Sequence, residues 1–243
     1  MRNDELDKAA DLYGKSIVID GQGGAFWKTD ISAFEKRQKS GITSQVVTVP
    51  RNPEGGFRNA IDYLAMHHKW VQSSSERAVL TSSVEMIRNA KREGKFASIF
   101  GSQGSKILED DLKLLAIFRK LGVMIIQLTY NERTLIGDGC AERTNSGLSN
   151  FGVDVVREMN RIGIVVDLSH CGEVTTLDAI DVSKDPVLFT HANPKMLCNN
   201  PRNKTDNQIK ALAEKGGVMG ISSNSFFCEV KKGVRPTILD FIT

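Results

Sequence analysis

The run Ile164-Val165-Val166-Asp167-Leu168 is followed at once by Ser169-His170, and Pro186-Val187-Leu188-Phe189-Thr190 is followed at once by His191. Both runs are apolar and do not alternate with polar residues, which is typical of strands buried on both faces of a parallel sheet. A helical stretch, 173–183, lies between them. The region therefore predicts a strand–helix–strand unit with a histidine at the end of each strand.

The same alternation extends over the chain in both directions. Further strands are expected at 16–19, 45–49, 96–100, 123–129 and 217–221, and further helices at 58–73, 75–93, 110–121, 149–162, 205–215 and 236–242. An open doubly wound sheet and a (β/α)8 barrel both fit this order. No G-x-G-x-x-G follows the first strand, and the polar residues of interest follow strand ends, which favours the barrel. The prediction is an α/β fold, an incomplete TIM-like (β/α)8 barrel of about seven strands, forming one domain over residues 1–243 that lacks its C-terminal unit.

Composition excludes several classes of protein. The chain has 243 residues with 32 basic and 29 acidic side chains, so the clustered excess of base that a nucleic-acid surface needs is missing. No window approaches 18 uninterrupted apolar residues, which predicts no membrane span. The four cysteines include no C-x-x-C pair, so a zinc knuckle is not expected, and their low number is typical of a reducing compartment. Residues 1–12 are charged and lack an apolar core, so we expect no signal peptide and a cytoplasmic location.

His170 and His191 should lie side by side, because they follow consecutive parallel strands about 4.8 Å apart. Imidazole is a common ligand of zinc and similar ions, but a histidine can also simply hold a loop, and the residues alone leave the two roles near even. His67 and His68 sit within a predicted helix, where a structural role is expected. If His170 and His191 bind one ion, their nearest ring nitrogens should lie within roughly 5 Å of each other.

Two histidines do not complete a metal site, since catalytic zinc takes about three protein ligands. Asp20 ends the first strand and could be a ligand or an internal hydrogen-bond acceptor. Gln103 follows the third strand, where an amide is a poor zinc ligand. Arg202, after the sixth strand, could hold a substrate carboxylate through its planar fork, although a surface arginine that fixes its loop is the commoner role.

Several segments together resemble the membrane dipeptidase (renal dipeptidase) family of binuclear zinc hydrolases. The most specific are Gly147–Gly152, Val156–Gly163, Val166–His170, Thr190–Asn193, Pro201–Asn203 and Gly216–Gly220. The resemblance implies a zinc-dependent barrel hydrolase that cleaves dipeptides. A similar small amide as the substrate and a homodimer as the assembly both stay open. In such enzymes two ions share a bridging carboxylate and activate a water that attacks the peptide carbonyl.

Three residues match functional positions of the family. His170 and His191 match the two histidines that bind one ion, and Arg202 matches the arginine that holds the substrate's carboxylate. Other positions differ, and the family's last aspartate would fall beyond Thr243. The resemblance therefore predicts zinc, as one ion only, bound mainly by the two histidines.

The differing positions are also part of the predicted site. The family's His-x-Asp is Gln22-Gly23-Gly24 here, its bridging glutamate aligns with Gln103, and its substrate-contacting histidine aligns with Tyr130. We therefore expect Gln22 and Gln103 to face the same barrel mouth as the histidines and Tyr130 to contact substrate. The first hypothesis is a dipeptidase-like metal-dependent hydrolase. The alternative is a catalytically inactive relative or fragment that binds a small carboxylate ligand, and metal content would distinguish them.

Overall fold

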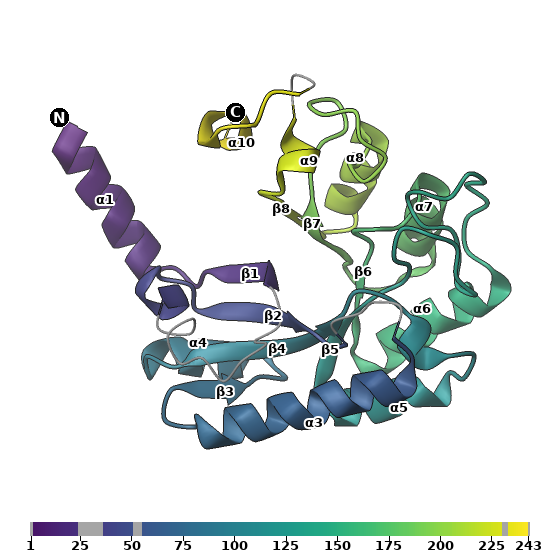
Figure 1. Cartoon of the computed structure of the whole chain (residues 1–243), viewed down its shortest axis with the longest axis horizontal. Helices are drawn as coiled ribbons and strands as arrows, with labels where there is room; N and C mark the ends of the chain where they lie inside the picture. The colour runs from purple at the N-terminus through teal and green to yellow at the C-terminus, as the bar shows by residue number, and fades with distance from the viewer. Residues whose placement is uncertain (1, 24–35, 51–54, 230–232, 243) are drawn as a thin grey trace.

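The computed structural model describes residues 2–23, 36–50, 55–229 and 233–242. Its centre is a curved parallel sheet in which seven strands follow one another in the order β1-β2-β4-β5-β6-β7-β8, while β3 pairs with β4 outside this path. The sheet is barrel-like and nearly closed (Figure 1). The strands are β1 Ile19–Gly23, β2 Ser44–Thr48, β3 Ala78–Leu80, β4 Phe96–Ser102, β5 Val123–Gln127, β6 Val165–Asp167, β7 Leu188–Ala192 and β8 Val218–Ile221. The predicted seven-stranded α/β barrel is confirmed.

Helices precede, connect and follow these strands. They are α1 Arg2–Lys15, α3 Phe57–Ser73, α4 Val84–Arg92, α5 Lys113–Lys120, α6 Asn150–Ile162, α7 Glu173–Val182, α8 Asp206–Glu214, α9 Ser225–Cys228 and α10 Ile238–Ile242, with a 3-10 turn at Lys106–Leu108. α1 extends away from the body of the fold, as Figure 1 shows. Among the helices in the described part of the chain, none has both the length and the hydrophobicity needed to cross a bilayer.

Local sequence signals account for the helix boundaries near the site. The Ser149 side chain accepts a hydrogen bond from the Gly152 amide at the start of α6, and Gly163 ends that helix with a positive φ of 73°. Thr205 begins α8 with a capping box, in which its side chain and that of Gln208 each accept from the other residue's backbone N–H. Both caps agree with the predicted helix starts.

Two predicted elements are wrong in their bounds. Residues 16–19 were expected to form a buried strand, but β1 begins only at Ile19, and Ile17 and Ile19 are 40% and 49% exposed. β1 is an end of the sheet path, so no described strand lies along one of its sides. Residues 75–93 were expected to be one helix, but Ala78–Leu80 forms β3, because backbone pairing with β4 outweighs local helix propensity.

The two ends of the described sheet do not pair with each other. β1 and β8 end the path and are not paired with each other among the described strands. β1 instead approaches β7 at Gly21, where an added Cβ would come 2.5 Å from the carbonyl oxygen of Thr190. A glycine is needed there because any side chain would collide with the β7 backbone.

The main core lies between sheet and helices and includes the fully buried Phe96, Phe100, Phe118 and Phe189. His67 is buried in α3 against Phe100, with 5.9 Å between ring centroids, and burial lowers its pKa to about 4. The neighbouring His68 contacts the carbonyl oxygen of Leu121 through Nε2 at 2.9 Å. These packing contacts agree with the structural role predicted for both histidines.

Candidate functional site

The ends of β6 and β7 bring His170 and His191 together. Their Nε2 atoms are 2.9 Å apart, which confirms the predicted approach of the ring nitrogens. His170 follows β6 in the loop, whereas His191 lies within β7, one residue before the strand ends. The sixth strand, predicted at 186–190, was therefore placed two residues too early. Two nitrogens bound tetrahedrally to one zinc would be about 3.4 Å apart, given bonds of about 2.1 Å, so little movement would be needed.

The Nδ1 atoms of the two rings are held by other side chains. His170 Nδ1 lies 2.7 Å from Asn131 Oδ1, an acceptor, and therefore carries a proton. His191 Nδ1 lies 2.8 Å from Thr190 Oγ1, whose own proton is donated to Asp167 Oδ2 at 2.7 Å. His191 Nδ1 is thus also a donor. In the neutral rings both Nε2 lone pairs then face each other, an arrangement that a shared cation would stabilise.

Electrostatics keep this histidine pair neutral. Burial lowers the pKa of His170 well below its usual value, and the nearby Arg202, His191 and Lys204 lower it further. Burial also lowers the pKa of His191, to about 4, although the Asp167 carboxylate opposes this. Neutral imidazoles are the form that binds a metal ion.

Asp167, at the end of β6, organises the backbone that carries both histidines. One carboxylate oxygen accepts from the Ser169 amide at 3.0 Å, the Ser169 hydroxyl at 2.6 Å and the Thr190 amide at 3.1 Å. The other oxygen accepts from the Thr190 hydroxyl. Sequence reasoning quoted Asp167 without assigning it a role, although an acid inside an apolar strand signals a buried acceptor.

Arg202 and Lys204, from the loop after β7, hold the carbonyls around the histidines. Arg202 Nη1 donates to the carbonyl of Ser169 and Nη2 donates to that of His191, the latter at 2.7 Å. Arg202 is only 4% exposed, so a surface role is excluded, and burial lowers its pKa. Lys204 Nζ donates to the carbonyls of Leu168 and Cys171. Sequence reasoning identified Arg202 but missed Lys204.

The two predicted glutamines meet at a third residue. Gln22 Nε2 and Gln103 Nε2 both donate to Thr48 Oγ1, the second at 3.1 Å, so the ends of β1, β2 and β4 converge. Thr48 was not singled out from the sequence. Gly24, the third residue of the segment that matches the family's His-x-Asp, lies outside the described residues. Tyr130 stacks on His170, with 4.3 Å between ring centroids and 25° between planes.

This donor set fits a metal ion only in part. The two imidazoles provide two nitrogen ligands, whereas catalytic zinc usually has three protein ligands. Within the residues that the structure describes, no group of three or more His, Cys, Asp or Glu side chains is placed to hold a metal ion. The two imidazoles by themselves therefore provide only part of the ligand set that a catalytic zinc ion needs.

Comparison with known proteins agrees with this geometry. A model of the membrane dipeptidase family (peptidase family M19) matches residues 7–243. Dipeptidase tcpJ of Claviceps purpurea is 31% identical over 235 residues, covering 90% of this chain and 51% of its own length. Dipeptidase verJ of Clonostachys rogersoniana is 30% identical, covering 82% of this chain and 50% of its own length. The chain thus spans about half the length of these curated relatives.

A solved structure shows the same fold. An amidohydrolase from Pseudomonas aeruginosa superposes with a TM-score of 0.87 and 38% identity, over 96% of this chain and 69% of that one. Family membership also implies a metal cofactor, which fits the paired imidazoles. Because the family model covers nearly the whole chain and the barrel places both histidines as expected, this chain belongs to the membrane dipeptidase family.

Proposed function

We propose that the chain is a metal-dependent hydrolase of dipeptides or similar small amides, with a single zinc ion held by the Nε2 atoms of His170 and His191. The observation that carries the proposal is the 2.9 Å approach of these two atoms. Because both Nδ1 atoms are engaged by acceptors, both Nε2 lone pairs are available to a metal.

A zinc ion bound there would supply a polarised carbonyl and a water of lowered pKa. The chain's own residues orient and enclose that position. Asn131 fixes the tautomer of the His170 ring directly. Asp167 fixes the tautomer of the His191 ring through the Thr190 hydroxyl. Tyr130 covers one face of the His170 ring, and we keep it as the residue that contacts substrate from that side.

Arg202 remains our candidate for the substrate's carboxylate. A guanidinium has five N–H donors, and hydrogen bonds to two backbone carbonyls leave some of its terminal N–H groups free. Its burial means that a carboxylate would have to approach close to the histidine pair, which would bring the scissile carbonyl near the metal. Gln22 and Gln103 are proposed to line the opposite wall, where neutral amides add little to metal affinity.

A second function is favoured by those same glutamines. If two imidazoles hold zinc too weakly, the chain would be a catalytically inactive relative or fragment that binds a small carboxylate ligand at Arg202. The hydrogen bonds from Gln22 and Gln103 to Thr48, in place of carboxylate ligands, support this alternative.

Metal analysis separates the two functions. The chain would be purified without chelator, its zinc content measured, and the metal-free chain titrated with zinc, followed by an assay with dipeptides. One zinc per chain, lost in both His170→Ala and His191→Ala, together with dipeptide hydrolysis supports the hydrolase. No binding at micromolar zinc supports the inactive relative. The cytoplasmic location, a homodimer and a single domain over residues 1–243 stay predictions.

A further inference from the structure

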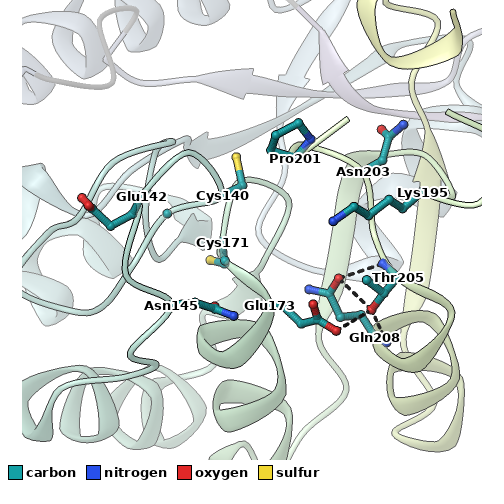
Figure 2. Close-up of a pocket in the computed structure, with 12 residues that line it drawn as sticks. Cys140, Glu142, Asn145, Cys171, Glu173, Lys195, Pro201, Asn203, Thr205 and Gln208 are labelled. Carbon is teal, nitrogen blue, oxygen red and sulfur yellow. Dashed lines mark hydrogen bonds between the residues drawn. The ribbon is translucent and has the colours of Figure 1, made fainter. Parts of the chain in front are cut away.

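A pocket lies beside the histidine pair. It has a volume of about 180 Å³ and is formed by the loop after β5, the start of α7, the loop after β7 and the start of α8 (Figure 2). None of the predicted metal or substrate residues lines it. A cavity of about 150 Å³ can hold a molecule the size of benzene, so this pocket has room for a small organic molecule.

Two opposite charges face this pocket. Lys195 extends into it from one wall and Glu173 lies on another wall, as Figure 2 shows. Over the described part of the chain, neither side chain has an ion-pair partner. Glu173 Oε1 accepts from the Thr205 hydroxyl at 2.9 Å, so this bond holds the carboxylate in place and leaves Oε2 available. The pocket therefore presents a free cation and a free anion that do not neutralise each other.

A buried amide adds a hydrogen-bond donor to the pocket. Gln208 is 2% exposed, and its Oε1 accepts from the Thr205 amide at 2.9 Å. This capping bond fixes the amide so that Nε2 points into the space between the pocket walls, where it has no hydrogen-bond partner among the described residues (Figure 2). The starts of α7 and α8, which carry partial positive charge, border the same space.

We propose that this pocket binds a small zwitterionic α-amino acid. The carboxylate of the ligand faces Lys195 Nζ and Gln208 Nε2, and its ammonium group faces Glu173 Oε2. A ligand with only one charge would leave Lys195 or Glu173 unpaired, so complementarity selects the zwitterion. The proposal depends neither on the metal nor on the hydrolase activity.

Calorimetric titration of the full chain tests the proposal with glycine and L-alanine as probes and with acetate and methylammonium as single-charge analogues. We expect the amino acids to bind at least about tenfold more tightly than either analogue, because each lost charged hydrogen bond weakens binding by about that factor. Acetate binding as tightly as glycine, or no binding of either amino acid at millimolar concentration, would overturn the proposal.

Variants locate the binding site. Lys195→Met removes the cation, and Glu173→Gln removes the anion while keeping an oxygen for the Thr205 hydroxyl. Each should weaken glycine binding about tenfold or more, with folding checked by circular dichroism. His191→Ala is the control and should bind glycine as the parent chain does. Binding that is lost in His191→Ala but kept in Lys195→Met would place the ligand at the histidine pair and refute the proposal. If either pocket variant fails to fold, the comparison of glycine binding with acetate binding in the parent chain still tests the proposal.

Discussion

The ammonium group of Lys204 lies 2.7 Å from the carbonyl oxygen of Leu168, in a position that is 1% exposed. The same group donates to the Cys171 carbonyl at 2.9 Å, so one buried charge holds both ends of the Leu168–Cys171 turn that presents His170. Burial lowers the pKa of Lys204 to about 8, which leaves it mainly protonated at neutral pH. The turn therefore depends on a cation that the sequence alone did not reveal.

Replacing this lysine should destabilise the fold. Lys204→Met keeps much of the side-chain volume but removes the charged donor of two buried carbonyls, of which that of Leu168 keeps only the bond from the Cys171 amide at 3.2 Å. We expect the free energy of unfolding to fall by about 3 kcal/mol, since a hydrogen bond to a charged group contributes about 1.5–3 kcal/mol. Urea denaturation measures the change. Lys210→Met, the same substitution at an exposed position of α8, is the matched control and should change stability by less than about 0.5 kcal/mol.

Removing the charge of Asp167 should loosen both histidines. In Asp167→Asn an amide NH2 group replaces one acceptor oxygen, so a donor faces either the Ser169 hydroxyl or the Thr190 hydroxyl. We expect a loss of about 2 kcal/mol in unfolding free energy and about tenfold weaker zinc binding, because a metal ligand depends on the groups that orient it. Chemical denaturation and a zinc titration measure the two effects. Asp181→Asn, exposed on α7, is the control, and equal behaviour of the two variants would contradict the orienting role.

Asp138 should make stability depend on pH in the acid range. Its carboxylate is almost fully buried and accepts from the Arg133 side chain, the Thr144 hydroxyl and the Ser146 amide. These bonds, that from Arg133 first, lower its pKa from 3.8 to about 2. A depressed carboxyl pKa stabilises the fold above the unfolded value and loses that contribution as pH falls through the folded value.

Between pH about 4 and about 2 the chain should therefore lose about 2 kcal/mol of unfolding free energy through Asp138. Denaturation curves across this range measure the loss. Asp138→Asn cannot titrate, so its stability should fall less steeply over the same interval. Parallel pH profiles for the parent chain and the variant would show that other carboxyls cause the acid sensitivity.

Restoring a carboxylate after β4 should strengthen metal binding. In the parent chain Gln103 Nε2 donates to the Thr48 hydroxyl. In Gln103→Glu the Thr48 hydroxyl can instead donate to the new carboxylate, so a hydrogen bond between the two side chains is kept. We expect zinc affinity to rise about tenfold, since an anionic oxygen is a far better zinc ligand than an amide. Gln103→Met is the control for loss of the amide alone. Unchanged affinity in Gln103→Glu would mean that this side chain does not reach the ion held by His170 and His191.

Much of the fold was predictable because its signals are local. The apolar runs at β2, β4 and β5 are buried in any parallel sheet, and caps such as Ser149 and Thr205 mark helix starts through their own backbone neighbours. β3 was not predictable, because Ala78–Leu80 becomes a strand only by pairing with β4. The start of β1 was predicted wrongly because β1 lies at one end of the sheet path. How far its residues are exposed depends on which strands lie beside it, and the local sequence does not show that.

By itself the sequence determined that His170 and His191 stand at adjacent strand ends. The order of the strands, and the position of each histidine within two residues of its predicted strand end, are enough to place them. Only the tertiary structure decided what surrounds them. Arg202 and Lys204 bond to backbone carbonyls, and every residue has a carbonyl, so no pattern of side chains marks those partners. A buried charged side chain can bind a ligand or stabilise the fold. Its role depends on which polar groups lie within about 3 Å of it after the chain has folded, and contacts between residues distant in sequence decide which groups those are.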